Sequence, residues 1–106
     1  MGGAAVLAFP ACLAAATALS QSLPDARKGL EFARVHCAMC HAVETGNRRS
    51  VNPEAPAFSV IAASPGMSEA ALHAALQSLH RRMPDILLAP TDRANVVAYI
   101  MGLKAE

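Results

Sequence analysis

The stretch HCAMCH places Cys37, Cys40 and His41 within one turn of chain, and this triplet constrains the fold more than any other feature. Thiols and an imidazole at such spacing occur in structural zinc sites and in redox-active disulfides. A structural zinc ion takes four ligands, and the chain has no second CxxC or HxxxH pair to complete them. A thioredoxin-like pair opens a helix within a βαβ unit, whereas these cysteines follow a helical pattern. Both settings are therefore disfavoured.

The full pattern Cys-x-x-Cys-His is typical of c-type haem attachment. Two thiols that add to the two vinyl groups on one haem edge must lie about one helical turn apart, and the adjacent imidazole then falls beneath the iron. A large apolar cofactor also suits this chain, because it has no Trp and one Tyr and its apolar content is largely Ala. Cys37 and Cys40 are therefore the predicted thioether anchors of a haem c, and His41 is the predicted proximal ligand.

Residues 1–21 carry no charged side chain and are rich in Ala. A long apolar run followed by the small residues Ala18 and Ser20 favours an export signal that a signal peptidase removes. The usual Lys or Arg near the start is absent, however, and the run is just long enough to span a bilayer. We expect residues 1–21 to be a signal peptide or an N-terminal membrane anchor, and residues 22–106 to form one domain.

Three helical patterns and no strand pattern predict an all-α domain. The first helix is expected to be capped by Ser22, with Pro24 in its first turn, and to run into the cysteine pair. The charge of Asp25 favours the positive end of this helix. The second starts at Ser68, and its leucines recur at spacings of four and three. The third is capped by Thr91 and Asp92. Its apolar stripe consists of Val96, Val97, Ile100 and Leu103.

Two loops join these predicted helices. Residues 42–66 are rich in Pro, Gly, Asn and Ser, with room for one short helix at 58–63, and residues 80–90 form the second loop. Each loop contains an arginine pair, Arg48 with Arg49 and Arg81 with Arg82. These pairs suit either a docking surface near a haem edge or ordinary solvated charge.

The net charge of the chain is +1, and no basic run is interleaved with aromatic residues. Proteins that bind nucleic acid carry a basic patch that neutralises phosphates. The charge pattern therefore argues against a nucleic-acid partner.

The run GLEFARVHCAMCH at 29–41 resembles the first helix and haem site of small bacterial class I cytochromes c. Three further stretches are similar to parts of that family: APAF at 55–58 to its proline loop, HRRMP at 80–84 to its distal-ligand loop, and VAYI at 97–100 to its last helix. Their order and spacing match across essentially all of residues 22–106. The resemblance implies a cytochrome c fold, with three main helices and loops wrapped around one covalently bound haem.

The sixth iron ligand is expected to be Met83, one of five methionines in the chain. It lies in a loop directly before Pro84, which biases it to extended geometry and helps to hold its thioether toward iron. His80 is the alternative ligand and would give a bis-His site.

The resemblance also assigns residues around the proximal ligand. It implies that the carbonyl of Pro56 accepts the Nδ1 hydrogen of His41, with Pro53 as a rival. Phe58 is expected either to pack on the haem face or to belong to the ordinary core. The crossing of the first and last helices is expected at Gly29, Phe32 and Tyr99.

Iron with His and Met ligands has no open position, so we expect single-electron transport between redox partners and no enzyme activity. Covalent haem attachment outside the cytoplasm places the protein in the periplasm. Its expected partners are a membrane complex or a periplasmic dehydrogenase or oxidase, met in brief, small contacts. A tether through residues 1–21 would hold it at the membrane. Two alternatives stay open: a haem c subunit of such a dehydrogenase or oxidase complex, and a haem enzyme or sensor for a small ligand if Met83 does not bind iron.

Overall fold

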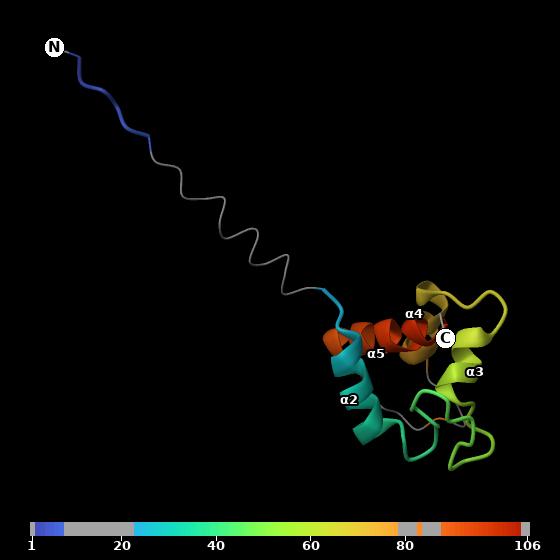
Figure 1. Ribbon diagram of the computed structural model, residues 1–106. Coiled ribbons are helices and arrows are strands. Elements are labelled where there is room, and N and C mark those ends of the chain that lie inside the picture. The colour runs from blue at the N-terminus through green and yellow to red at the C-terminus, as the bar shows by residue number, and fades with distance from the viewer. Residues whose placement is uncertain (1, 8–22, 79–82, 84–87, 105–106) are drawn as a thin grey trace.

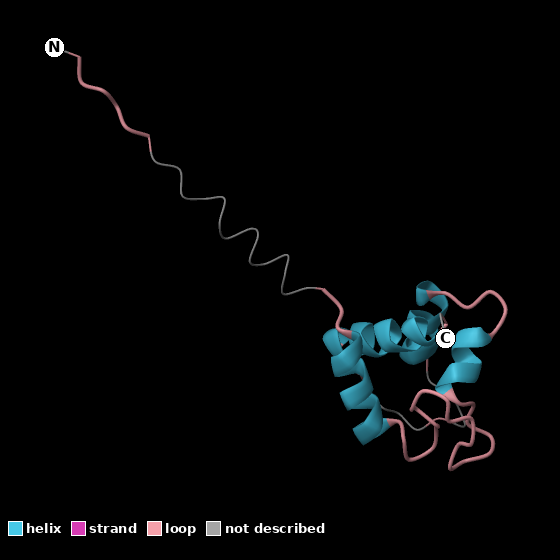
Figure 2. Ribbon diagram, in the orientation of Figure 1, coloured by secondary structure: helices cyan, strands magenta, loops and turns pink. Residues whose placement is uncertain are grey.

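The computed structural model describes residues 2–7, 23–78, 83 and 88–104. Within these ranges the chain forms four helices and no strand (Figures 1 and 2). They are α2 (Ala26–His36), α3 (Phe58–Ala63), α4 (Glu69–Gln77) and α5 (Pro90–Leu103). The all-α prediction is confirmed, including the short helix at 58–63. No helix in this described part is both long enough and apolar enough to cross a membrane.

The start of α2 differs from the predicted one. Asp25 is the N-cap, and its carboxylate accepts hydrogen bonds from the backbone N–H groups of Arg27 at 2.9 Å and Lys28 at 3.3 Å. The prediction that Ser22 caps this helix is therefore wrong, because the side chain of Asp25 satisfies two N–H groups that the helix leaves open. Asp25 does lie at the positive helix end, as expected. Ser22, the predicted cap, lies outside the described residues.

The start of α4 agrees with the sequence pattern. The hydroxyl oxygen of Ser68 accepts a hydrogen bond from the N–H of Ala71 at 3.1 Å, as an N-cap does. Leu72 on this helix is buried in the core, and Leu76 packs against it. The last leucine of the predicted pattern, Leu79, lies outside the described residues.

The start of α5 falls earlier than predicted. The helix begins at Pro90, and Ala89 precedes it without a side-chain cap, so the prediction that Thr91 and Asp92 cap it is wrong. A proline suits the first helical position because its fixed φ is helical and its missing N–H would have had no partner there. Asp92 falls in the first turn, where its charge still favours the positive helix end. The predicted apolar stripe of α5 is buried.

The core lies where α5 packs against α2, α3 and α4, and Figure 1 shows α5 crossing α2. Gly29 of α2 lies at this crossing, as expected, and its neighbour on α5 is the backbone of Asn95. Tyr99 is buried in the same core, and Phe32 packs against it. The chain between α2 and α3 then forms one long loop that brings the residues after α2 back beside the start of α3 (Figure 2).

Candidate functional site

The cysteine pair lies directly beyond the end of α2. Cys37 caps the helix, and its N–H donates to the carbonyl of Ala33 at 2.8 Å. The N–H groups of Cys40 and His41 both donate to the carbonyl of Cys37, at 3.2 and 2.9 Å. The three predicted attachment residues are thus held in one tight turn that continues the helix.

Both thiols of this turn are free and half-buried. Cys37 packs against the hydrophobic core, and this burial raises the pKa of its thiol to about 11. At neutral pH the thiol is therefore uncharged, as an apolar surrounding requires. Two neighbouring thiols that are not joined in a disulfide are the groups that thioether formation with a haem needs.

His41 is oriented by the proline loop. Its Nδ1 lies 2.6 Å from the carbonyl oxygen of Pro56, and a carbonyl can only accept, so Nδ1 carries the hydrogen. In the neutral imidazole with this tautomer, Nε2 is the ring nitrogen that is available to a metal. The structure places Pro56 at this contact; the part that Pro56 plays at a bound haem stays a prediction.

Three further hydrogen bonds connect the residues around His41 to the loop at 50–58. The N–H of Asn52 donates to the carbonyl of Cys40 at 3.1 Å. The N–H of Ala42 donates to the hydroxyl oxygen of Ser50 at 2.9 Å, and the N–H of Phe58 donates to the carbonyl of Ala42 at 2.9 Å. The imidazole is thus fixed both through its own ring and through the backbone on either side.

Phe58 lies beside this imidazole. Its ring is 4% exposed, and its centroid is 5.5 Å from that of His41 and 6.4 Å from that of Tyr99. The hydroxyl of Tyr99 donates to the carbonyl of Val43 at 2.6 Å, which holds α5 against the segment after His41. Phe58 therefore belongs to the core and touches the proximal side of the site; its contact with a haem face stays a prediction.

An exposed ion pair lies at the outer edge of the same segment. Arg34 of α2 donates from Nε to Glu44 at 2.6 Å and from Nη2 at 3.0 Å. These hydrogen bonds hold the pKa of the Glu44 carboxyl below its ordinary value, and they raise the pKa of Arg34. The pair fastens the chain after His41 to the helix before Cys37.

The distal side of the site is described only in part. Met83 is half-buried, and its neighbours on both sides lie outside the described residues. The same holds for His80, the alternative ligand, and for Arg81, Arg82 and Pro84. The assignment of Met83 as the sixth ligand therefore stays a prediction.

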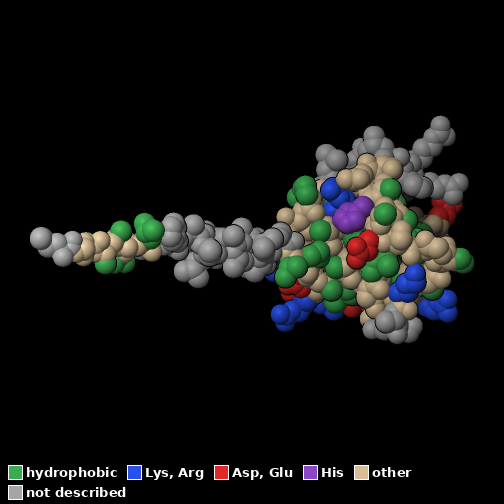
Figure 3. Space-filling model, turned by 90° about the horizontal axis from the view of Figure 1, so that it is seen from above, with side chains coloured by type: hydrophobic (Ala, Val, Ile, Leu, Met, Phe, Trp, Pro, Cys, Tyr) green, Lys and Arg blue, Asp and Glu red, His purple; other side chains and the backbone are tan. Residues whose placement is uncertain are grey.

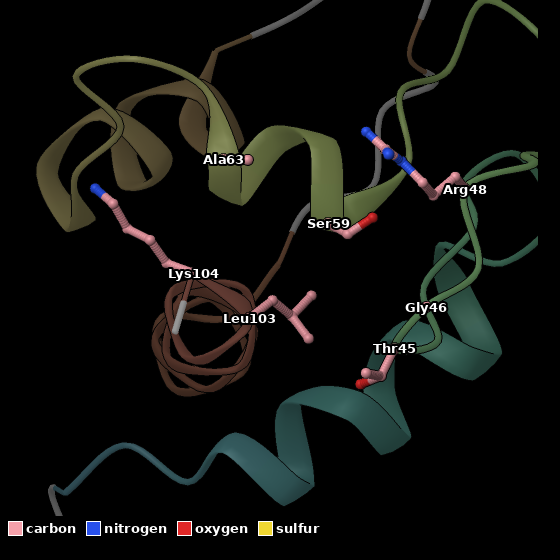
Figure 4. A pocket seen from close by; sticks show the side chains of 7 residues that line it. All are labelled: Thr45, Gly46, Arg48, Ser59, Ala63, Leu103 and Lys104. Carbon is pink, nitrogen blue, oxygen red and sulfur yellow. The ribbon is translucent and has the colours of Figure 1, made fainter. Parts of the chain in front are cut away.

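The other predicted arginine pair lies in the loop after the site. Arg48 and Arg49 are exposed, and Arg48 lines a hollow of about 370 Å³ between its loop, α3 and the end of α5 (Figure 4). Lys104, at the other side of this hollow, donates to the carbonyl of Met67 at 2.9 Å. No predicted haem ligand lines the hollow. On the face shown in Figure 3, acidic and basic side chains are mixed and do not form one basic patch.

Sequence reasoning missed two residues that shape the site. Asn52 bonds to Cys40 in the attachment turn and Ser50 bonds to Ala42 directly after it, and neither belongs to a motif that predicts such a role. Within the described part of the chain, no group of three or more His, Cys, Asp or Glu side chains is arranged to hold a metal ion.

Comparison with known proteins places this geometry in a family. Over 96 residues, the chain is 33% identical to cytochrome c-552 of Bradyrhizobium diazoefficiens, covering 88% of this chain and 91% of that protein. No family model matches the chain, and no solved structure does. The similarity spans nearly the whole length of both chains and includes the helical domain described above. The chain therefore belongs to the small bacterial c-type cytochromes and has their all-α fold.

Proposed function

We propose that this protein is a periplasmic carrier of single electrons that binds one covalent haem c. Cys37 and Cys40 form its thioether bonds, and His41 and Met83 are its axial ligands. The observation that carries the proposal is the contact between Nδ1 of His41 and the carbonyl of Pro56, which leaves Nε2 as the nitrogen available to a metal. Two free thiols lie in the same turn of chain. The name of the similar protein, cytochrome c-552, supports the same function.

The bound haem supplies an iron that takes up and releases one electron. Electron transfer is fast when the ligands move little between the two oxidation states, and the residues around His41 serve this need. Hydrogen bonds from residues 50–58 hold the backbone on either side of His41, at Cys40 and Ala42, and the carbonyl of Pro56 holds its ring. The Nδ1 hydrogen bond also makes the imidazole a stronger electron-pair donor to iron, which favours the oxidised state of the haem.

Met83 completes the site in this proposal. A thioether ligand raises the reduction potential relative to a second imidazole, and it closes the position at which a substrate would bind. This closure is the reason to assign electron transport and no enzyme activity. The partners are redox proteins, either a membrane complex or a periplasmic dehydrogenase or oxidase, and residues 1–21 direct export or tether the protein.

The experiment is to express the chain in a host that matures c-type haem and to test haem release by acid acetone. Retained haem supports covalent attachment, and extractable haem contradicts it. The oxidised protein should show the charge-transfer band of a thioether on iron, and Met83→Leu should abolish this band. Met39→Leu is the matched control, because Met39 is 77% exposed and its replacement should leave the band intact.

Carbon monoxide separates the remaining alternatives. The unmutated reduced protein should not bind it readily, whereas Met83→Leu should. Ready binding by the unmutated protein would contradict the carrier assignment and favour a haem enzyme or sensor. Co-purification in fixed ratio with a periplasmic dehydrogenase or oxidase would instead identify a subunit of that complex.

A further inference from the structure

We propose that Ser50 is a positioning residue that sets the orientation of the haem ligand His41 through the backbone of Ala42. The inference rests on the proposed function in one respect, which is that His41 binds iron. Ser50 lies in the loop between α2 and α3 and belongs to none of the motifs of the haem site. Its hydroxyl oxygen accepts a hydrogen bond from the N–H of Ala42 at 2.9 Å.

Ser50 can affect His41 because its hydrogen bond is made to the next residue of the chain. Ala42 follows His41 directly and is 4% exposed, so water does not readily replace a lost partner of its N–H. The other bonds around His41 use backbone groups of Asn52, Phe58 and Pro56 or the imidazole itself. Among the four hydrogen bonds that join His41 and its two neighbours to residues 50–58, the one to Ser50 alone uses a side chain of the loop. Substitution can therefore remove it and leave the others chemically intact.

Removal of the hydroxyl leaves a buried N–H without an acceptor, which destabilises the folded chain if nothing moves. The backbone at Ala42 relieves this cost when it turns toward water, and the adjacent His41 turns with it. The bond from Nδ1 to Pro56, 2.6 Å long in the structure, is then lengthened and weakened. A weaker hydrogen bond makes the imidazole a poorer donor to iron, because the carbonyl partner increases its basicity.

The direction of the effect on the haem follows from this chain of contacts. An imidazole that donates less electron density to iron stabilises the oxidised iron less. Loss of the Ser50 hydroxyl therefore raises the reduction potential of the haem. The same loosening exposes the Nδ1 hydrogen of His41 and the N–H of Ala42 to exchange with solvent. A residue that merely stabilised the loop would lower the unfolding midpoint without either change.

The test compares Ser50→Ala with Ser50→Thr, which keeps the hydroxyl, in the haem-loaded protein. Ser59→Ala is the matched control, because the Ser59 hydroxyl is buried and makes no hydrogen bond in the described structure. The readouts are the reduction potential, the hydrogen exchange of His41 Nδ1–H and Ala42 N–H by NMR, and the unfolding midpoint.

Ser50→Ala should raise the potential and speed both exchange rates about tenfold, as expected for one lost hydrogen bond of ordinary strength. Ser50→Thr and Ser59→Ala should match the unmutated protein. If Ser50→Ala does not accumulate, Ser50→Val is compared with its shape-matched partner Ser50→Thr, and the same differences are expected.

Two failures can be told apart. A lower unfolding midpoint in Ser50→Ala with unchanged potential and exchange rates overturns the positioning role alone. Release of haem from the unmutated protein by acid acetone overturns the proposed function, and the role of Ser50 toward a haem ligand with it.

Discussion

Gly29 of α2 lies directly against the backbone of Asn95 of α5. A side-chain carbon added at Gly29 would overlap the carbonyl group of Asn95 and lie against the N–H of Val96, both of which are main-chain atoms that cannot swing away. The side chain of Asn95 strengthens the same crossing, because its Oδ1 accepts a hydrogen bond from the N–H of Asp25 at 2.8 Å. The two helices therefore meet backbone to backbone, with a glycine on one side and a buried amide on the other.

Gly29→Ala should destabilise the protein by about 1–3 kcal/mol, the usual cost of inserting a carbon into a filled contact. Helix propensity alone would predict the opposite, a gain in stability, since alanine is a better helix former than glycine. Gly102→Ala in α5 is the matched control, because a side-chain carbon there meets nothing within 4 Å and should stabilise the helix by up to about 1 kcal/mol. Denaturant unfolding of the haem-loaded variants measures both. Equal stabilisation by the two changes would show that the helices do not touch at Gly29.

Tyr99→Phe should lower the free energy of unfolding by about 1–3 kcal/mol, because it leaves the buried carbonyl of Val43 without the hydroxyl that now donates to it at 2.6 Å. Ser64→Ala also removes one hydroxyl that donates to a carbonyl, but at an exposed position, and should cost less than about 0.5 kcal/mol. Thermal unfolding of the two variants gives the comparison. A cost for Tyr99→Phe no larger than that for Ser64→Ala would argue that the Val43 contact adds nothing to stability.

The ion pair of Arg34 and Glu44 should make a small, pH-dependent contribution to stability. The two side chains are 53% and 47% exposed, so solvent screens their attraction. Because the folded state lowers the pKa of Glu44, the contribution is fully present above the ordinary value of 4.5 and is lost as the pH falls through the lower folded value. Glu44→Gln should therefore lower the unfolding midpoint slightly at neutral pH and have no effect in strong acid.

A double-mutant cycle with Arg34→Gln isolates this pair from other effects of the two changes. The coupling between the two substitutions should be present at neutral pH and low salt, and it should vanish in strong acid and at about 1 M salt, where charges are screened within about 3 Å. A coupling that persists in strong acid would show that the two residues interact by packing and not by charge.

The sequence by itself determined the features that depend on nearby residues. The CxxCH motif lies within one turn of chain, and its spacing alone indicates haem attachment. The apolar stripe of α5 repeats at the period of a helix. Both features could therefore be predicted without knowledge of the fold. The cap at Ser68 is equally local and was also predicted. Met83 remains a prediction from its place before Pro84.

Tertiary structure alone decided the contacts between distant segments. The family resemblance favoured Pro56 over its rival Pro53, and the path of the chain placed the carbonyl of Pro56 beside His41. No sequence motif identifies Ser50 or Asn95 as important. Each accepts a hydrogen bond from a backbone N–H that is distant in the sequence, and only the fold brings that N–H away from water and next to the side chain. The start of α2 was misplaced for a related reason, since several adjacent polar residues can each cap a helix and packing selects among them. No side chain caps α5, which begins at Pro90 after Ala89.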